Sequence, residues 1–265
     1  MDKAHADTYA LVTGGSQGLG LAICRRLIAE GCRKLVLTTR DTHKGDHAAV
    51  ELAAMGAEVH VLTLDMADID KVQAMVPAAV DRIGKINALV NCAANTDRGS
   101  ILDTTPAQWD AIVDVNAKAP FFALQGFANH CLSTGHAGAA VNILSIVVHC
   151  GLPFLAPYAA SKAALVNITK NSANTLAKHG IRVNGINVGW MDTPGEDATQ
   201  KKWHGRTTGW LAEAEANMPF GKLVKPEDVA WQTSFLLGPQ SGVITGSIID
   251  FDQQVVGAYP DTNDA

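Results

Sequence analysis

A tyrosine and a lysine four positions apart could carry out acid–base chemistry together. Tyr158 and Lys162 occur in the run Tyr-Ala-Ala-Ser-Lys at the start of a segment with helical periodicity. Residues four apart lie on the same face of a helix. A phenol with an ordinary pKa of about 10 is a poor base at neutral pH, but a neighbouring ammonium group favours its ionised form. We therefore expect Lys162 to lower the pKa of Tyr158.

A serine completes the candidate set. Ser145 lies thirteen residues before the tyrosine and directly follows a run of aliphatic residues that is typical of a buried strand. By itself, the Tyr/Lys pair also fits an ordinary exposed pair on a helix surface. The chemical interpretation therefore depends on the elements that surround these residues.

A glycine-rich loop lies near the start of the sequence. The segment 13–20 reads Thr-Gly-Gly-Ser-Gln-Gly-Leu-Gly, between an aliphatic run and a helical pattern. Gly14, Gly18 and Gly20 permit a tight turn and close approach of the backbone, and the start of the helix offers free N–H groups to a pyrophosphate. We expect a dinucleotide to bind here.

The same loop contains Gly-x-Ser-x-Gly around Ser16, which is the pattern of the nucleophile turn in α/β-hydrolases. In those enzymes the serine follows a central strand, with several elements before it. Only 15 residues precede Ser16. A hydrolase is therefore disfavoured by the order of the elements.

The residues after the second predicted strand bear on the choice of dinucleotide. An acid at this position would bind the 2′-hydroxyl of NAD, but here the sequence is Thr39-Arg40-Asp41. A small hydroxyl residue leaves room, and a guanidinium group can bind a 2′-phosphate through two hydrogen bonds. The pattern favours NADP(H). NAD(H) remains possible, because Arg40 could be a solvated charge and Asp41 follows it.

Strand and helix patterns alternate along the chain. The predicted strands are Tyr9–Thr13, Lys34–Thr39, Glu58–Thr63, Ala88–Asn91, Ala140–Leu144, Arg182–Asn187 and Ser247–Phe251. The predicted helices are Gly18–Glu30, Lys44–Met55, Ile69–Ile83, Pro106–Cys131, Tyr158–Lys178 and Pro226–Leu237. This order predicts an α/β fold: a Rossmann-like, doubly wound parallel sheet of about seven strands with helices on both faces.

No repeat or linker divides the sequence, so we expect one dinucleotide-binding catalytic domain over residues 1–265. The segment Trp190–Phe220 interrupts the alternation. Long insertions of this kind are usually functional, and we expect it to form a lid over the substrate. Trp203, His204 and Trp210 could stack on a sugar ring or fasten this lid to the core.

Composition limits the classes of partner and compartment. The formal net charge is −5 and no run of Lys or Arg occurs, so nucleic acid is not expected as a partner. The apolar runs are too short to span a bilayer, and the polar N-terminus lacks the features of a secretory signal. The 5 cysteines are scattered without a Cys-x-x-Cys pair, so no metal site is expected. We expect a soluble cytoplasmic protein with reduced thiols.

These motifs and their order resemble the short-chain dehydrogenase/reductase family, in its single-domain branch of about 250 residues, over residues 8–256. The resemblance implies that Tyr158 is the general acid/base, that Ser145 binds the substrate oxygen, and that Lys162 binds the nicotinamide ribose. A cationic nicotinamide would also favour the ionised tyrosine. Asn116 matches the family asparagine that supports a water-mediated proton relay.

The resemblance also implies a set of cofactor-binding residues. They are Gly14, Ser16, Gln17, Gly18, Leu19, Gly20, Thr39, Arg40, Asp65, Met66, Asn91, Ala93, Tyr158, Lys162, Gly189, Met191 and Thr193.

Two family motifs are changed in this sequence. The usual Asn-Asn-Ala-Gly is Asn-Cys-Ala-Ala over residues 91–94, which is expected to shift the local turn. The usual Asn-Pro-Gly is Asn-Val-Gly over residues 187–189, and the loss of proline predicts a looser loop around Met191 and Thr193. Both changes affect the positioning of the cofactor rather than the proton chemistry.

Substrate contacts are expected from residues that follow the strand ends: Ser145, Val147, His149, Trp190 and Asn95. His149 could bind a hydroxyl or carboxyl group, but a lone histidine at a strand end is equally often a packed or solvated residue. The sequence indicates a small polar or cyclic ketone, or a sugar alcohol.

The interpretation is an NADP(H)-dependent oxidoreductase that interconverts a secondary alcohol and a ketone. The alternatives are an NAD(H)-dependent member of the same family and a non-catalytic dinucleotide-binding regulator, which we would expect to lack Tyr158 or Lys162. The apolar faces of Pro106–Cys131 and Tyr158–Lys178, with the stretch Val255–Tyr259, resemble the subunit interfaces of the family. They predict a homotetramer, or otherwise a homodimer.

Overall fold

The computed structural model describes residues 3–258, and they contain one parallel sheet of seven strands. The strands lie in the order β3-β2-β1-β4-β5-β6-β7. Their bounds are β1 Tyr9–Val12, β2 Lys34–Thr39, β3 Glu58–Thr63, β4 Ala88–Asn91, β5 Gly138–Ser145, β6 Ile181–Val188 and β7 Ile248–Phe251. The predicted fold class is confirmed, and every predicted strand is present.

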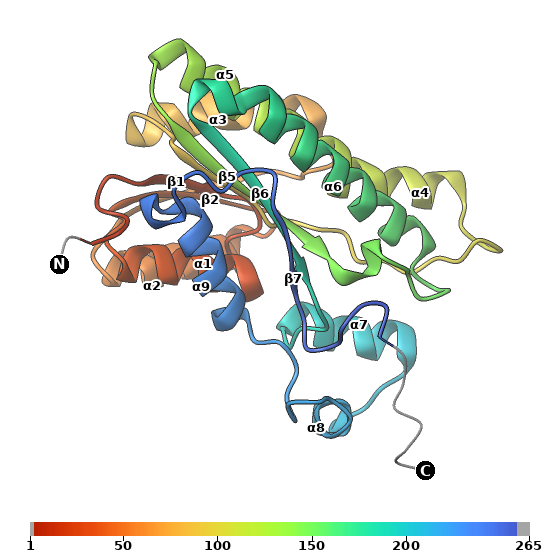
Figure 1. Ribbon diagram of the computed structural model, residues 1–265. Helices are drawn as coiled ribbons and strands as arrows, with labels where there is room; N and C mark the ends of the chain where they lie inside the picture. Colours follow the sequence, from red (N-terminus) through yellow and green to blue (C-terminus); the bar gives the residue numbers. More distant parts are fainter. Residues whose placement is uncertain (1–2, 259–265) are drawn as a thin grey trace.

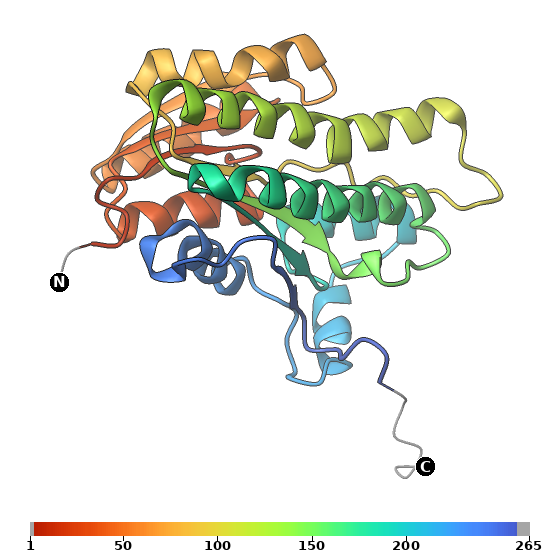
Figure 2. The ribbon, with the colours of Figure 1, turned by 45° about the horizontal axis from the view of Figure 1, so that its top comes forward.

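Helices cover both faces of the sheet (Figure 1). Their bounds are α1 Gly18–Ala29, α2 Thr42–Ala54, α3 Ile69–Ile83, α4 Pro106–Val113, α5 Ala119–Thr134, α6 Ala156–Leu176, α7 Pro194–His204, α8 Trp210–Ala216 and α9 Pro226–Leu237. Figure 2 shows α3, α5 and α6 running across one face, and α1, α2 and α9 lie on the other.

Alternation along the strands divides the core into two layers. In β1, Ala10 and Val12 pack with α1 and α9, whereas Leu11 between them packs with α3 and α5. All three side chains are buried. Successive side chains of a strand point to opposite faces, so a run of aliphatic residues is what a strand covered on both faces requires.

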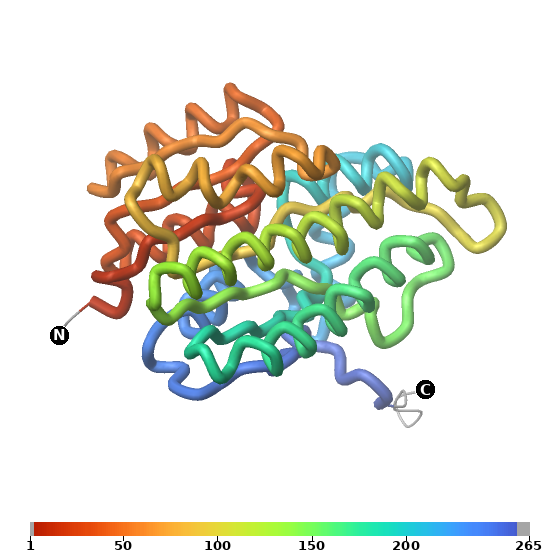
Figure 3. Tube along the Cα trace, turned by 90° about the horizontal axis from the view of Figure 1, so that it is seen from above, coloured from red at the N-terminus to blue at the C-terminus, as the bar shows by residue number. Residues whose placement is uncertain are grey.

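The predicted helix Pro106–Cys131 is not continuous, and the prediction was wrong at this point. It is divided into α4 and α5 by a π-helical turn at Asp114–Lys118 that contains Asn116. The view from above in Figure 3 shows the two helical segments following one another beside α6. A π-turn accommodates one added residue in a helical turn, and such turns are frequent at functional sites.

Short polar side chains define where several helices begin. Asp41, Asp68, Thr105 and Thr193 each accept a hydrogen bond from a backbone N–H in the first turn of the helix that follows. Such caps bind N–H groups that have no partner within the helix. α1 has no side-chain cap and no acidic residue in its first turn.

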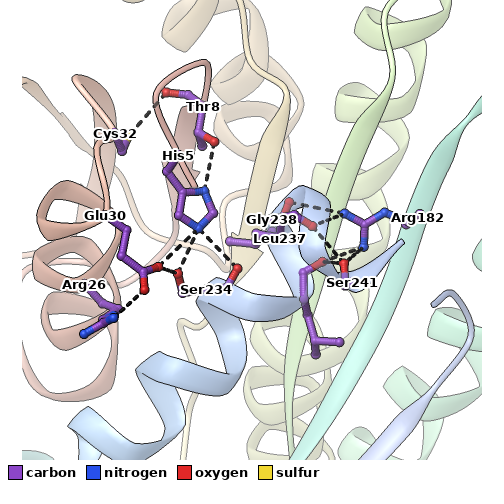
Figure 4. Close-up of polar contacts among 11 residues, drawn as sticks. His5, Thr8, Arg26, Glu30, Cys32, Arg182, Ser234, Leu237, Gly238 and Ser241 are labelled. Carbon is purple, nitrogen blue, oxygen red and sulfur yellow. Dashed lines mark hydrogen bonds and ion pairs between the residues drawn. The ribbon is translucent and has the colours of Figure 1, made fainter. Parts of the chain in front are cut away.

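Buried polar contacts join the N-terminal segment to α9 (Figure 4). His5 Nε2 lies 2.8 Å from Ser234 Oγ, and Ser234 also contacts Glu30. On the other side of this helix, Arg182 donates to the carbonyl oxygens of Leu236, Leu237 and Gly238, which end it. Among residues 3–258, no helix is both long enough and apolar enough to cross a bilayer.

Candidate active site

The glycine loop lies at the point where the strand order reverses. β2 lies on one side of β1 and β4 on the other, and ligands bind at the carboxyl ends of strands beside such a reversal. Gly14 has a φ of +67°, and a Cβ atom there would lie 3.0 Å from the Ala93 backbone. At Gly20 a Cβ atom would lie 2.2 Å from the Gly14 carbonyl oxygen. The loop therefore requires glycine at both positions.

Hydrogen bonds join this loop to β2 and to the segment that follows β4. Thr38 at the end of β2 accepts from the backbone N–H groups of Gly14 and Gly15. Thr13 Oγ1 accepts from the backbone N–H groups of Cys92 and Ala93, at 2.9 and 3.1 Å. Thr13 was predicted only as the first residue of the glycine-rich segment, and Thr38 was not predicted; both hold loops in place.

The start of α1 has the properties of a pyrophosphate site. Gln17 precedes the helix in an extended conformation, and its side chain accepts from Lys44 Nζ at 2.8 Å instead of capping the helix. Among the described residues, the first-turn N–H groups of Gly18, Leu19 and Gly20 have no hydrogen-bond acceptor. Free N–H groups at a helix N-terminus favour an anion. These residues fit the phosphates of a dinucleotide.

The segment that follows β2 contacts the glycine loop and carries an exposed cation. Thr39 is buried, and its hydroxyl contacts Ser16 Oγ at 2.9 Å and the backbone of Asp41. The Asp41 carboxylate caps α2 by accepting from the backbone N–H of Lys44. The Arg40 side chain is exposed. The Asp41 carboxylate, which could have repelled a 2′-phosphate, thus caps its own helix.

The residues predicted on the adenosine side follow β3 and β4. Asp65 is exposed and accepts from the backbone N–H of Ala67 at 2.9 Å, while Met66 is buried. The Asn91 side chain is buried and donates to Asn142 Oδ1 of β5 at 2.8 Å. Only the backbone of Asn91 is therefore available for a contact with a nucleotide.

Backbone hydrogen bonds and close packing hold the loop after β6, where the loss of proline predicts loosening. Val188, which replaces the family proline, is the last residue of β6 and is buried. Beyond it, Trp190 and Asp192 each make a backbone hydrogen bond of 3.0 Å with Val224. Gly189 lies so close to β7 that a Cβ atom would be 2.2 Å from Asp252 Oδ1.

This loop also approaches the glycine loop. Met191 forms a β-bridge with Val224, and the Thr193 side chain caps α7. A Cβ atom on Gly18 would lie 3.7 Å from that threonine side chain. The predicted cofactor residues at the ends of β1 and β6 are thus brought together.

Ser145, Tyr158 and Lys162 also meet at the carboxyl edge of the sheet. Ser145 is the last residue of β5, and its hydroxyl is close enough to Tyr158, on the first turn of α6, to act on the pKa of the phenol. Lys162 Nζ lies 5.8 Å from the centroid of the tyrosine ring and donates to the Ile143 carbonyl oxygen at 2.8 Å. The side chains that the sequence separates thus form one cluster.

Burial controls both pKa values in this cluster. It raises the pKa of Tyr158 to about 12, although the nearby Ser145 hydroxyl acts in the opposite direction. It also lowers the pKa of Lys162, which is 2% exposed, to about 8. A low-polarity environment disfavours the charged form of each group. We expected Lys162 to lower the pKa of Tyr158, and this prediction was wrong. The protein's own groups raise that pKa, so the phenol stays protonated.

Asn116 connects this cluster to the loop after β4. Its side chain accepts from the Asn95 backbone N–H at 2.8 Å and donates to the Asn95 carbonyl oxygen at 2.9 Å. It also donates to Ser161 Oγ at 3.1 Å. The Asn116 side chain therefore positions loop and helix, and Lys162 donates to β5 instead of to it.

Two of the predicted substrate residues are engaged elsewhere. His149 Nε2 lies 3.0 Å from both carboxylate oxygens of Asp250, in a surface groove that also includes Val148 and Lys170 and excludes Ser145 and Tyr158. The Asn95 side chain bonds the backbone of Ala111 and Asp97. Val147 donates its backbone N–H to Ser145 Oγ at 3.4 Å and so stays beside the cluster.

The predicted lid contains two helices that the sequence analysis missed, α7 and α8, which lie together in Figure 1 beyond the helices that cover the sheet. Trp190 stacks on Trp210 with ring centroids 6.0 Å apart. Trp210 is buried and donates from Nε1 to Asp197 Oδ1 at 2.9 Å, so it fastens the lid. Trp203 is exposed, and His204 packs on Phe154.

Arg98 and Glu196 are site residues that the sequence analysis did not find. The charge of Arg98 lowers the pKa of Tyr158 and the charge of Glu196 raises it, so both groups lie within electrostatic reach of the phenol. Arg98 lies in an irregular loop and Glu196 in an unpredicted helix, so no periodic pattern marks them. Among the described residues, no cluster of His, Cys, Asp or Glu could hold a metal ion.

Comparison with known proteins gives consistent results. The family model described as enoyl-(acyl carrier protein) reductase matches residues 14–253. Galactitol 2-dehydrogenase of Agrobacterium fabrum is 32% identical over 249 residues, covering 92% of this chain and 95% of that protein. The 3-oxoacyl-[acyl-carrier-protein] reductase of Staphylococcus aureus is 30% identical over 240 residues, covering 91% and 94%.

A crystal structure of a variant actinorhodin polyketide ketoreductase with NADPH superimposes with a TM-score of 0.87. It is 30% identical in sequence, and the match covers 96% of this chain and 99% of that one.

Proposed function

Because this chain belongs to the short-chain dehydrogenase/reductase family of oxidoreductases, we propose that it is an NADP(H)-dependent enzyme interconverting a secondary alcohol and a ketone. The observation that carries the proposal is the cluster of Ser145, Tyr158 and Lys162 at the same sheet edge as the glycine loop. A regulator without turnover would have no need of this complete set.

NADP(H) is preferred to NAD(H) because of the residues after β2. Arg40 is exposed beside the buried Thr39, and the Asp41 carboxylate is bound to its own helix. A guanidinium group binds a 2′-phosphate strongly, whereas an acid would repel it. The solved ketoreductase with NADPH supports the same choice.

The proposed mechanism divides hydride and proton transfer between cofactor and protein. When bound, the nicotinamide would supply or accept the hydride. Tyr158 would give its phenolic proton to the substrate oxygen during reduction and accept it during oxidation, while Ser145 hydrogen-bonds the same oxygen. Burial raises the pKa of Tyr158 to about 12, which favours the donor form. During oxidation, the positive charge of the oxidised nicotinamide would act in the opposite direction.

Substrate size and polarity follow from the surroundings of the cluster. The lid contributes Trp190 and Glu196, which contact each other, and Arg98 lies beside Glu196. Together they provide one aromatic and two charged groups. A small polar or cyclic substrate fits this mixture, and the name of the galactitol 2-dehydrogenase relative supports the inclusion of sugars and polyols.

The proposal extends to the domain, its assembly and its location. We take residues 1–265 as one catalytic domain with the lid at residues 190–220. Trp109, Phe121 and Leu132 are exposed on α4 and α5, which supports a homotetramer or homodimer built on this face. The stretch Val255–Tyr259 reaches beyond the described residues at Tyr259. All five cysteines are unpaired, which supports a cytoplasmic location.

A titration of the purified protein with NADPH and NADH tests the proposal directly. We expect tighter binding of NADPH, followed by its oxidation on at least one ketone or keto-sugar, or by reduction of NADP⁺ on at least one polyol. Tight binding with no turnover on any of them would favour the regulator. Tighter binding of NADH would contradict the cofactor assignment.

A further inference from the structure

Arg98 is fixed beside the helix that carries the catalytic tyrosine. Its neighbour Gly99 forms a β-bridge with Leu155. The Gly99 N–H donates to the Phe154 carbonyl oxygen at 2.9 Å, and the Ala156 N–H donates to the Gly99 carbonyl oxygen at 3.0 Å. Because α6 begins at Ala156, these bonds hold Arg98 near Tyr158 on the first turn.

The guanidinium group of Arg98 is only partly used by the protein. Its side chain is 12% exposed and lies over the Phe154 ring. Nη1 donates to the Thr96 carbonyl oxygen at 3.0 Å, and Nε lies 3.5 Å from His204 Nε2. Within the described part of the chain, Nη2 has no acceptor at hydrogen-bond distance, since the nearest carboxylate oxygen, Glu196 Oε1, is 4.0 Å away. The Nη2 group of a nearly buried cation therefore has no hydrogen-bond acceptor among the described residues.

Glu196 offers an acceptor opposite this donor. Its side chain is 17% exposed, and Oε1 accepts from Trp190 Nε1 at 2.8 Å and from Gln200 Nε2 at 2.7 Å. Oε2 receives no hydrogen bond from the described residues. Two neighbours thus fix the orientation of the carboxylate while one of its oxygens stays available.

We propose that Arg98 and Glu196 together bind a hydroxyl group next to the reacting carbon, and that the substrate is an uncharged polyhydroxylated alcohol or its ketone. This inference rests on the proposed function and specifies its substrate class. A hydroxyl can accept from Arg98 and donate to Glu196 at once.

Other substrate classes fit this pair less well. An apolar neighbour to the reacting carbon would leave Arg98 Nη2 and Glu196 Oε2 without a hydrogen-bond partner in a poorly solvated site, which is costly. A carboxylate or phosphate could bind Arg98 but would be repelled by Glu196. Both groups act on the pKa of Tyr158, in opposite directions, which agrees with their position at the reacting centre.

Steady-state oxidation of three alcohols with NADP⁺ tests this inference. The probes are galactitol as the neutral polyol, galactonate as its anionic relative, and cyclohexanol as a secondary alcohol without further hydroxyl groups. We expect kcat/KM for galactitol to exceed that for each of the other two by at least about tenfold, the value of one charge-assisted hydrogen bond.

Two variants separate the roles of the charges. Arg98→Met keeps the packing of the side-chain stem and should lower the galactitol to cyclohexanol ratio by about tenfold or more, chiefly through KM for galactitol. Glu196→Gln removes the negative charge and should raise the galactonate to galactitol ratio. Lys202→Met is the matched control, since Lys202 binds Asp97 in an exposed ion pair on the same lid helix and should leave both ratios unchanged.

The outcomes distinguish this inference from the proposed function. Turnover with no preference for galactitol, a preference for galactonate, or an unchanged galactitol to cyclohexanol ratio in Arg98→Met would overturn the assignment of the pair while leaving the oxidoreductase intact. A ratio that changes equally in Lys202→Met would assign the effect to lid docking and refute direct recognition. Absence of turnover on every alcohol and ketone would refute the proposed function, and this inference with it.

Discussion

The Nζ atom of Lys162 donates a hydrogen bond of 2.8 Å to the carbonyl oxygen of Ile143. Ile143 lies in β5, two residues before Ser145, so this bond ties the amine to the strand that positions the serine. Burial lowers the pKa of Lys162 to about 8, which means that the folded protein disfavours its positive charge. The position of this lysine therefore costs stability.

Replacing Lys162 by methionine should stabilise the fold and abolish most turnover. Methionine has a similar length and no charge to desolvate, so we expect the free energy of unfolding at pH 7 to rise by about 1–3 kcal/mol. Between the folded pKa of about 8 and the ordinary value of 10.5, the unfolded chain binds more protons. The stability of the unmodified protein should therefore rise with pH there, and the advantage of the variant should shrink.

Urea unfolding at pH 7 and pH 10 measures this effect. Lys170→Met on the exposed side of α6 is the control and should change stability little at either pH. A Lys162→Met variant that is less stable than the unmodified protein at pH 7 would contradict the argument.

Replacing Tyr158 by phenylalanine should remove the proton donor and keep the binding site. General acid–base catalysis contributes roughly 100-fold or more, so kcat should fall at least by that factor. The affinity for NADPH should stay within about threefold, because the phosphate loop and Lys162 are unchanged. Substantial residual turnover, measured as nucleotide absorbance with the best substrate of the screen, would be incompatible with the assigned role.

Replacing Arg40 by alanine should discriminate between the nucleotides. Only NADPH carries the 2′-phosphate, so its Kd should rise by about 10- to 100-fold, and that of NADH by less than about threefold. Arg33→Ala is the matched control, since this exposed arginine precedes β2 at its other end and donates to Gly56. Equal losses for both nucleotides in Arg40→Ala would mean that the cofactor was assigned wrongly.

Sequence reasoning found the residues that local patterns mark. The glycine loop and the Tyr158/Lys162 spacing are short local patterns, and the inner strands are recognisable because both of their faces are buried. The π-helical turn around Asn116 was missed because the segments on both of its sides are helical, so no helix-ending residue marks it. Arg98 and the Asp250 partner of His149 become visible only when loops and strands distant in sequence are brought together. No local pattern contains that information.

A methyl group at Gly20 should disrupt the phosphate loop. A Cβ atom there would lie 2.2 Å from the Gly14 carbonyl oxygen, and a backbone atom cannot rotate away as a flexible side chain can. We expect Gly20→Ala to weaken NADPH binding by at least about tenfold and to lower stability by roughly 1–3 kcal/mol. Gly195→Ala, where the nearest atom is 3.8 Å away, should leave both properties nearly unchanged. Wild-type NADPH affinity in Gly20→Ala would show that the loop adapts.

The buried contact between His5 and α9 predicts a loss of stability in mild acid. His5 is 0% exposed, lies 2.9 Å from Thr8 Oγ1 and 2.8 Å from Ser234 Oγ, and faces Glu30 and Arg26 (Figure 4). Burial lowers the pKa of His5 below its ordinary value of 6.5, although the charge of Glu30 opposes this shift. As the pH falls through 6.5, the unfolded chain is protonated before the folded protein, so the free energy of unfolding should decrease.

The comparison of His5→Gln with the unmodified protein isolates this titration between pH 7 and pH 5.5. The variant should lose some packing at pH 7 but show a shallower decrease, by up to about 1.4 kcal/mol per pH unit. Glu30 acts in a separate window, because its pKa is lowered from 4.5, so its stabilising charge is lost only at more acidic pH. His43→Gln on the exposed side of α2 serves as the control and should follow the unmodified protein. Parallel curves for the unmodified protein and His5→Gln would assign the acid sensitivity to other groups.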